Sequence, residues 1–88
     1  MKKREKREDV YELISYNIRK YRKKLGITQS QLAERTQYSH EFIRRVEAPH
    51  SKKFFSIDAI SNIADALEID LKQLLDKVDE SELMKRKK

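Results

Sequence analysis

Residues 21–47 have the sequence YRKKLGITQSQLAERTQYSHEFIRRVE, in which helix-capping signals recur at a short interval. Thr28 and Gln31 have the spacing of a capping box, in which each side chain accepts a bond from the other residue's backbone N–H. They predict a short helix over residues 28–35. After the link formed by residues 36–38, Ser39 is a suitable N-cap for another helix, which is expected to reach Val46. The stretch therefore predicts two short helices joined by a tight turn.

The second of these helices is expected to bury one side and to expose a polar one. At 100° per residue, Ile43 and Val46 point inward together. Arginine can bridge O6 and N7 of guanine, glutamate can accept from cytosine N4, and histidine can donate to a purine N7. Two packed helices alone could be an ordinary helical hairpin, but this exposed face favours recognition of DNA in the major groove. It has Glu41 and Arg45 at its centre, His40 and Arg44 on one flank, and Phe42 on the other.

A longer helix is predicted before this pair, over residues 9–25. Asp9 and Glu12 resemble an N-cap and its reciprocal acidic residue. Gly26 follows where a left-handed residue often ends a helix. An apolar stripe with helical spacing runs along the segment through Val10, Ile14, Ile18, Tyr21 and Leu25.

Two further helices are predicted after a loop at residues 48–55. Ser56 caps the first, and Asp70 with Gln73 forms a capping box for the second. We expect an all-α fold, with five short helices around one core over residues 9–78, between a basic arm (1–8) and a charged tail (79–88). The expected buried residues are Ile57, Ile60, Ile63, Ala64 and Leu67 in the first helix, and Leu71, Leu74, Leu75 and Val78 in the second.

Composition limits the classes of function. The 88 residues suffice for one small domain. The net charge of +6 favours polyanionic partners, although much of it lies in the terminal runs MKKREKR and KRKK, which could act in solubility alone. The absence of cysteine excludes disulfides, zinc–thiolate sites and thiol nucleophiles. With no apolar run of membrane-spanning length and no secretory signal pattern, we expect a soluble, cytoplasmic protein.

The quoted stretch is similar to the helix-turn-helix of the phage-repressor family of bacterial transcription regulators (lambda repressor and Cro-like, XRE-type). The resemblance extends over about residues 10–75 and rests on the order and spacing of several motifs. These are Arg22, Gly26, Thr28-Gln29, Leu32-Ala33, Ser39, Ile43, Val46-Glu47 and the segment SIDAISNIADALEID.

The resemblance implies a role for each matching residue. Ala33 allows close approach of the two short helices, and Gln29 contacts a phosphate and braces the first residue of the recognition helix. Arg22 and Glu47 form a structural ion pair. Base-reading positions are matched by His40, Glu41 and Arg45, to which the exposed face adds Arg44; contacts to the DNA backbone are expected from Thr28, Gln29, Ser39, Phe42, His50, Lys52 and Lys53, with Phe42 favoured as a packing residue at that boundary.

Three positions depart from the family pattern. Gln37 stands where glycine is frequent, so it must adopt a left-handed or altered conformation. Ala48 and Pro49 replace the usual polar residue and glycine, and the loop ending at Phe54-Phe55 is slightly longer than usual. These departures affect the path of residues 48–55 and leave the predicted fold intact.

Two alternatives to DNA recognition follow from the sequence. An enzyme or metal site could be imagined from His40 and His50 with Glu41 and Glu47, but no third ligand has recognised spacing. We therefore expect no catalysis, metal, cofactor or small-molecule substrate. A protein-interaction module, or an antitoxin-type autoregulator that retains the fold, is the stronger rival, because Glu41 at the centre of the face repels phosphates.

A single recognition helix contacts few base pairs, so we expect a homodimer on a palindromic site in double-stranded DNA, with half-sites about 34 Å apart. Repression by blocking polymerase is what the resemblance implies. The candidate dimer contacts are Leu71, Leu75, Val78, Leu83 and Met84, of which the first three could equally belong to the core.

Overall fold

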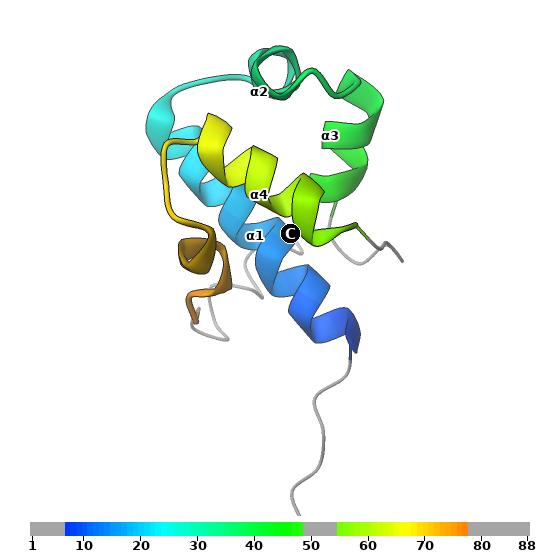
Figure 1. The fold of residues 1–88 in the computed structure, drawn as a ribbon, viewed down its shortest axis with the longest axis vertical. Coiled ribbons are helices and arrows are strands. Elements are labelled where there is room, and N and C mark those ends of the chain that lie inside the picture. Colours follow the sequence, from blue (N-terminus) through cyan, green and yellow to red (C-terminus); the bar gives the residue numbers. More distant parts are fainter. Residues whose placement is uncertain (1–6, 49–54, 78–88) are drawn as a thin grey trace, which may run out of the picture.

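The computed structural model describes residues 7–48 and 55–77. Within these ranges all regular structure is helical: α1 (Arg7–Leu25), α2 (Gln29–Thr36), α3 (His40–Glu47), α4 (Ile57–Ala66) and a short 3-10 helix, η1 (Leu71–Leu75). Figure 1 shows α4 crossing α1, with α2 and α3 together at the top of the view. The all-α prediction is confirmed, but a 3-10 helix replaces the expected fifth α-helix.

The first helix begins earlier than the sequence predicted. α1 starts at Arg7, so Asp9 lies within the helix and is not its N-cap. Arginine and glutamate favour helix, which allows Arg7 and Glu8 to extend α1 into the segment assigned to the N-terminal arm. Val10 was expected in the buried stripe but is 43% exposed. It lies near the beginning of α1, at the end that projects furthest from the other helices (Figure 1).

The core lies where α1, α2, α3, α4 and η1 meet. Burial of each large apolar side chain contributes about 1.5–3 kcal/mol, so these contacts fix the relative positions of the helices. Ala33 is buried among them, as close packing of α2 against α3 requires. The core consists of Ile14, Ile18, Leu32, Ala33, Ile43, Val46, Ile60, Ile63, Ala64, Leu67 and Leu74, with Ala59 also buried in α4.

The prediction that Ile57 is buried was wrong. Ser56 caps α4 as predicted, with its hydroxyl oxygen accepting from the Ala59 backbone N–H at 3.1 Å, but Ile57 is 68% exposed. The buried stripe of α4 is centred on Ile63 and Leu67, and Ile57 lies at its edge in the first turn. Helical spacing alone placed it in the stripe, whereas the neighbouring helices leave that edge uncovered.

The last helical segment, η1, also differs from the prediction. Leu74 is fully buried, Leu71 is half-buried and Leu75 is 48% exposed, so Leu75 is not a core residue. In a 3-10 helix residues three apart lie on the same side, which places Leu71 above Leu74 and turns Leu75 away. Val78 lies outside the described residues.

Three hydrogen bonds, which range from buried to exposed, attach the end of η1 to α1. Asn17 is fully buried, and its side-chain amide donates to the carbonyls of Leu74 at 2.8 Å and Asp76 at 3.0 Å. The Tyr21 hydroxyl donates to the Asp76 carboxylate at 3.3 Å. These contacts hold η1 against the side of α1 that α3 leaves free.

Candidate nucleic-acid interface

The predicted turn between α2 and α3 is present and tightly bonded. The Thr28–Gln31 capping box begins α2, and at the other end the backbone N–H of Gln37 donates to the Ala33 carbonyl at 2.8 Å. Gln37 has φ of 69°, the left-handed conformation expected at this position. Ser39 then caps α3 by accepting from the backbone N–H of Phe42 at 3.0 Å. Together these bonds set the angle at which α3 leaves α2.

α3 has the orientation that its sequence predicted. Ile43 and Val46 are 0% and 2% exposed, and they anchor the helix against the core. Four polar side chains are exposed on the other side: His40, Glu41, Arg44 and Arg45. Among residues 7–48 and 55–77, none of the four has a hydrogen-bond or ion-pair partner. All four are therefore available to a ligand.

Phe42 lies at the edge of this face and packs against the protein. It is half-buried, and its ring contacts the Tyr38 ring edge-on, with 5.0 Å between centroids. The Tyr38 hydroxyl in turn accepts from the Asn62 amide at 2.8 Å, linking the turn to α4. Phe42 therefore has a packing role at the boundary of the polar face.

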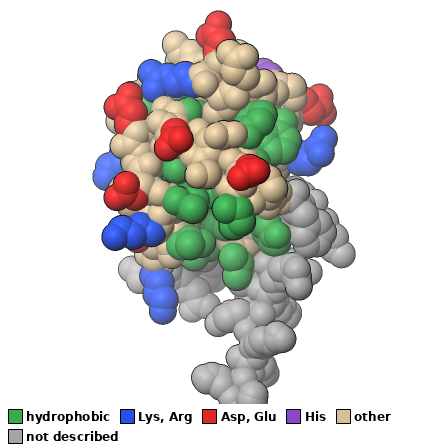
Figure 2. All heavy atoms as spheres, viewed as in Figure 1, with side chains coloured by type: hydrophobic (Ala, Val, Ile, Leu, Met, Phe, Trp, Pro, Cys, Tyr) green, Lys and Arg blue, Asp and Glu red, His purple; other side chains and the backbone are tan. Residues whose placement is uncertain are grey.

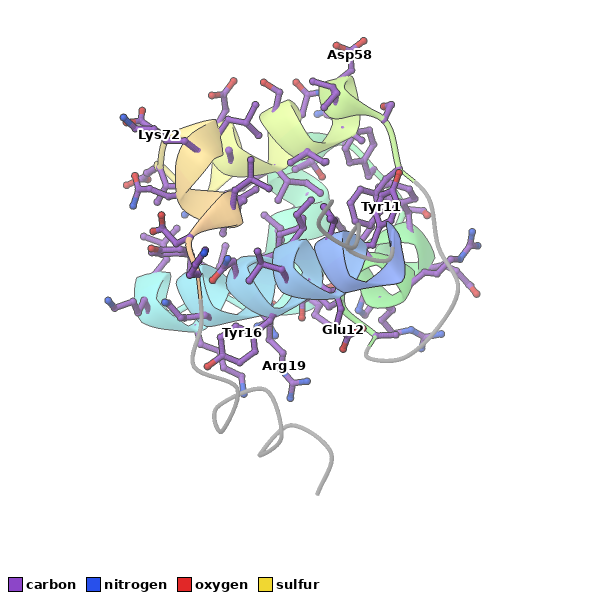
Figure 3. All side chains as sticks on the ribbon, turned by 90° about the horizontal axis from the view of Figure 1, so that it is seen from below. Tyr11, Glu12, Tyr16, Arg19, Asp58 and Lys72 are labelled. Atoms are coloured by element: carbon purple, nitrogen blue, oxygen red, sulfur yellow. The ribbon has the colours of Figure 1, made fainter. Side chains whose placement is uncertain are left out.

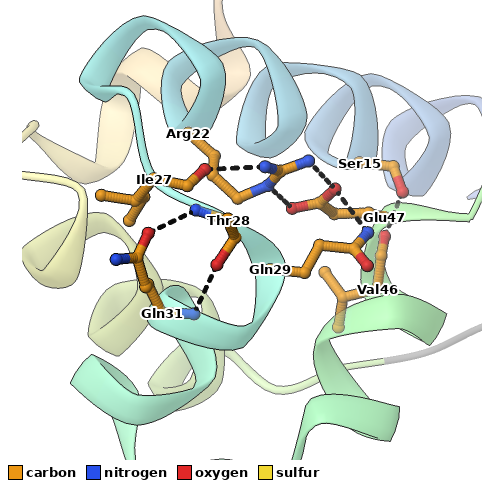
Figure 4. A network of polar contacts seen from close by, with 8 residues as sticks. All are labelled: Ser15, Arg22, Ile27, Thr28, Gln29, Gln31, Val46 and Glu47. Atoms are coloured by element: carbon orange, nitrogen blue, oxygen red, sulfur yellow. Dashed lines mark hydrogen bonds and ion pairs between the residues drawn. The ribbon is translucent and has the colours of Figure 1, made fainter.

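A buried ion pair fixes the other end of α3 (Figure 4). Arg22 Nε and Nη2 donate to the two carboxylate oxygens of Glu47, at 2.6 and 3.0 Å. The third guanidinium nitrogen, Nη1, donates to the carbonyl of Ile27 at 2.8 Å. The side chains of Arg22 and Glu47 are only 10% and 2% exposed. The pair joins α1, the α1–α2 link and the last residue of α3 in one network.

Comparison with known protein families gives a match to a helix-turn-helix family over residues 18–74, the segment that contains these features. The chain belongs to the XRE-type helix-turn-helix family. This membership supports a DNA-binding regulator of transcription. Helices α2 and α3 supply the helix-turn-helix of this family member.

A solved structure provides an independent comparison. The chain is similar to a crystal structure described as a hypothetical transcription factor, NHTF, from Neisseria, with a TM-score of 0.71 and 25% sequence identity. The match covers 90% of this chain and 84% of the other. A comparison with curated protein sequences finds no match.

Gln29 has a different partner from the one that the family resemblance implied. Its side-chain amide donates to Glu47 Oε1 at 3.0 Å, at the last residue of α3 and not at the first (Figure 4). The reason is that the buried Glu47 carboxylate, already held by Arg22, is a strong acceptor. One amide hydrogen of Gln29 remains for a contact outside the protein.

Sequence reasoning missed a further support of α3. Ser15 is fully buried, and its hydroxyl donates to the carbonyl of Val46 near the end of the helix. This bond ties the C-terminal carbonyls of α3, which lack partners within the helix, to α1. The available signal was the polar pair Ser15 and Asn17 on either side of an apolar stripe.

Three of the expected DNA-backbone residues, His50, Lys52 and Lys53, lie outside the described residues. The side chains of Thr28 and Ser39 are exposed at the first turns of α2 and α3. Their hydroxyl oxygens accept the capping bonds, which leaves each O–H free to donate. No helix in the described part of the chain is both long and apolar enough to span a membrane.

Proposed function

We propose that this chain is a sequence-specific DNA-binding transcription regulator that inserts α3 into the major groove. The observation that carries the proposal is the exposed polar face of α3, which projects from a helix anchored by Ile43 and Val46. In this arrangement Arg45 and Arg44 donate to guanine, Glu41 accepts from cytosine N4, and His40 donates to a purine N7. The Ser39 cap at one end of α3, and the buried contacts of Val46 and Glu47 at the other, hold these groups in place before DNA binds.

The backbone contacts proposed for this complex surround α3. The N-terminus of α2 presents Thr28 and Gln29, while Ser39 stands at the N-terminus of α3. Helix N-termini attract phosphates because their first N–H groups are unpaired and their dipole is positive there. Such contacts set the register of the protein on DNA, and the α3 side chains supply the specificity.

We further propose that the regulator binds a palindromic operator as a homodimer. One short helix contacts too few base pairs to select one genomic site, and a dimer places two such helices one DNA turn, about 34 Å, apart. Leu75 is the best supported contact of those considered, because η1 leaves it 48% exposed. Bound across a promoter, such a dimer would repress transcription by excluding polymerase.

The proposal is tested by selecting bound DNA from a random duplex library at moderate salt. A DNA-binding regulator enriches one palindromic sequence, and a footprint on that sequence shows protection of two half-sites. A protein-interaction module is the second candidate, because the exposed carboxylate of Glu41 repels phosphates. Failure to enrich any sequence would favour that module over the regulator.

A further inference from the structure

Four cationic side chains lie on the outer side of α1, over its last two turns, and none belongs to the proposed DNA interface. In the sequence of α1 they follow all of its acidic residues, the last of which is Glu12. Arg22, in the same segment, is buried and neutralised by Glu47. The four are Arg19, Lys20, Lys23 and Lys24.

Two of these cations lie on the edge of α1 nearer to α3. Ser15 and Arg22 mark that edge, because they bond to Val46 and Glu47 of α3. Residues three or four apart are neighbours on a helix, so Arg19 lies between Ser15 and Arg22. Lys23 follows Arg19 by one turn. Figure 3 shows Arg19 extending away from the body of the molecule.

The other two cations lie on the opposite edge. The ammonium groups of Lys20 and Lys24 are 5.1 and 5.9 Å from the centre of the Tyr21 ring. Such distances permit cation–π attraction. The Tyr21 hydroxyl contacts Asp76, which follows η1, so this edge faces η1 and not α3. α1 therefore carries two pairs of positively charged side chains, one on the edge towards α3 and one on the edge towards η1.

We propose that Arg19 and Lys23 bind phosphates of the DNA backbone beside the operator, which extends the interface from α3 onto α1. This proposal depends on the proposed DNA-binding function. Among the residues described, neither side chain has a carboxylate partner, so neither must break an ion pair to bind DNA. The bond from Arg22 to the Ile27 carbonyl holds the end of α1 beside the start of α2, where Thr28 and Gln29 are proposed to meet phosphates.

DNA is favoured over an acidic protein as the ligand of Arg19 and Lys23. The positive electrostatic potential of this edge adds to that of Arg44 and Arg45 on α3. Cations that point towards one extended polyanion act together, and each phosphate contact releases condensed counterions. Arginine can also grip a phosphate with two parallel N–H bonds. These contacts carry no sequence information and raise affinity for all DNA.

The experiment compares two double variants of equal charge, Arg19→Gln with Lys23→Gln, and Lys20→Gln with Lys24→Gln. Glutamine retains helix propensity, so both double variants should melt at the same temperature as the wild type. If the Arg19/Lys23 variant is destabilised, Lys23→Gln alone serves as a milder replacement. Kd is measured over a salt series on the selected operator and on an unrelated duplex. The Arg19/Lys23 variant should lose affinity by the same factor on both duplexes. Its slope of log Kd against log salt should fall by about 0.9 for each contact removed.

The Lys20/Lys24 variant should change that slope clearly less. Equal changes in the two variants would overturn the proposal, because they would reflect net charge alone. A wild-type slope in the Arg19/Lys23 variant would overturn it too, and would leave an acidic protein as the ligand of this edge. Absence of DNA binding by the wild type would instead refute the proposed function itself.

Discussion

Arg22 of α1 and Glu47 of α3 form a two-bond ion pair, at 2.6 and 3.0 Å, with both side chains nearly inaccessible to solvent. Because Glu47 also accepts from Gln29, a single carboxylate connects α1, α2 and α3. Buried charge is costly unless it is paired, so each member of this network depends on the others. The position of the polar face of α3 thus depends on residues that do not belong to it.

Removing one partner of this pair should strongly destabilise the fold. We expect Arg22→Met to lower the free energy of unfolding in urea by about 3 kcal/mol or more, because Glu47 stays buried without its counter-charge. Glu68→Gln is the control, since the exposed Arg35–Glu68 pair, at 3.6 Å, should contribute less than about 1 kcal/mol. Equal losses in the two variants would contradict the structural importance of the buried pair.

Glycine at position 37, in the turn between α2 and α3, should make the protein more stable than glutamine does. Gln37 has φ of 69°, which is strained for any residue with a Cβ, so Gln37→Gly should stabilise the protein. The gain should be about 0.5–1 kcal/mol, because relief of strain exceeds the added freedom of the unfolded chain. Gln37→Ala keeps the Cβ and should give no such gain. Thermal melting of the three proteins compares them, and a destabilised glycine variant would show that the glutamine side chain supports the turn.

The amide of Asn17 should hold η1 against α1. Asn17→Ala removes a buried hydrogen bond to the carbonyl of Leu74 and a partly buried one to the carbonyl of Asp76. The expected loss in the free energy of unfolding is about 1–3 kcal/mol, measured by chemical denaturation. Asn62→Ala is the matched control, because its amide makes one exposed bond to Tyr38. Asn62→Ala should lose clearly less stability than Asn17→Ala. A larger loss in Asn62→Ala would show that the contact at the turn is the more important one.

Arg45 should contribute specificity as well as affinity. Arg45→Ala should cost about 1–3 kcal/mol at the selected operator and relax the preference at one base pair. Lys72→Ala is the control: it removes another exposed cation, from η1, and should leave the base preference unchanged. Binding is measured on the operator and on its single-base variants. A uniform loss on all sequences would assign Arg45 to the DNA backbone.

Leu75 should support dimerisation. It is one of three exposed large hydrophobic residues among those described, and a separate group of hydrophobic side chains lies over α1 and α4 (Figure 2). Leu75→Ser should weaken self-association in sedimentation experiments with little loss of monomer stability, because Leu75 is 48% exposed. Ile57→Ser changes another exposed apolar residue, on α4, and serves as the control. If only the Ile57 variant dissociates, the interface lies on α4 and not on η1.

Local sequence is sufficient to predict the helix starts that depend on capping and the inward side of α3. Each capping side chain accepts from a backbone N–H three residues further along the chain, so neighbouring residues are enough to predict the cap. This applies to Thr28, Ser39 and Ser56. Ile43 and Val46 are close in sequence, and their shared side follows from helix geometry alone. The family could also be inferred, because its motif is a continuous segment.

Long-range packing determines which edges of the apolar stripes are covered and which distant polar groups meet. Ile57 and Leu75 belong to apolar patterns, yet the elements described here leave them 68% and 48% exposed. The Ser15–Val46, Asn17–Leu74 and Gln29–Glu47 bonds join residues from different elements. Such contacts depend on how the helices pack against one another, and that packing results from the whole core and not from any local pattern.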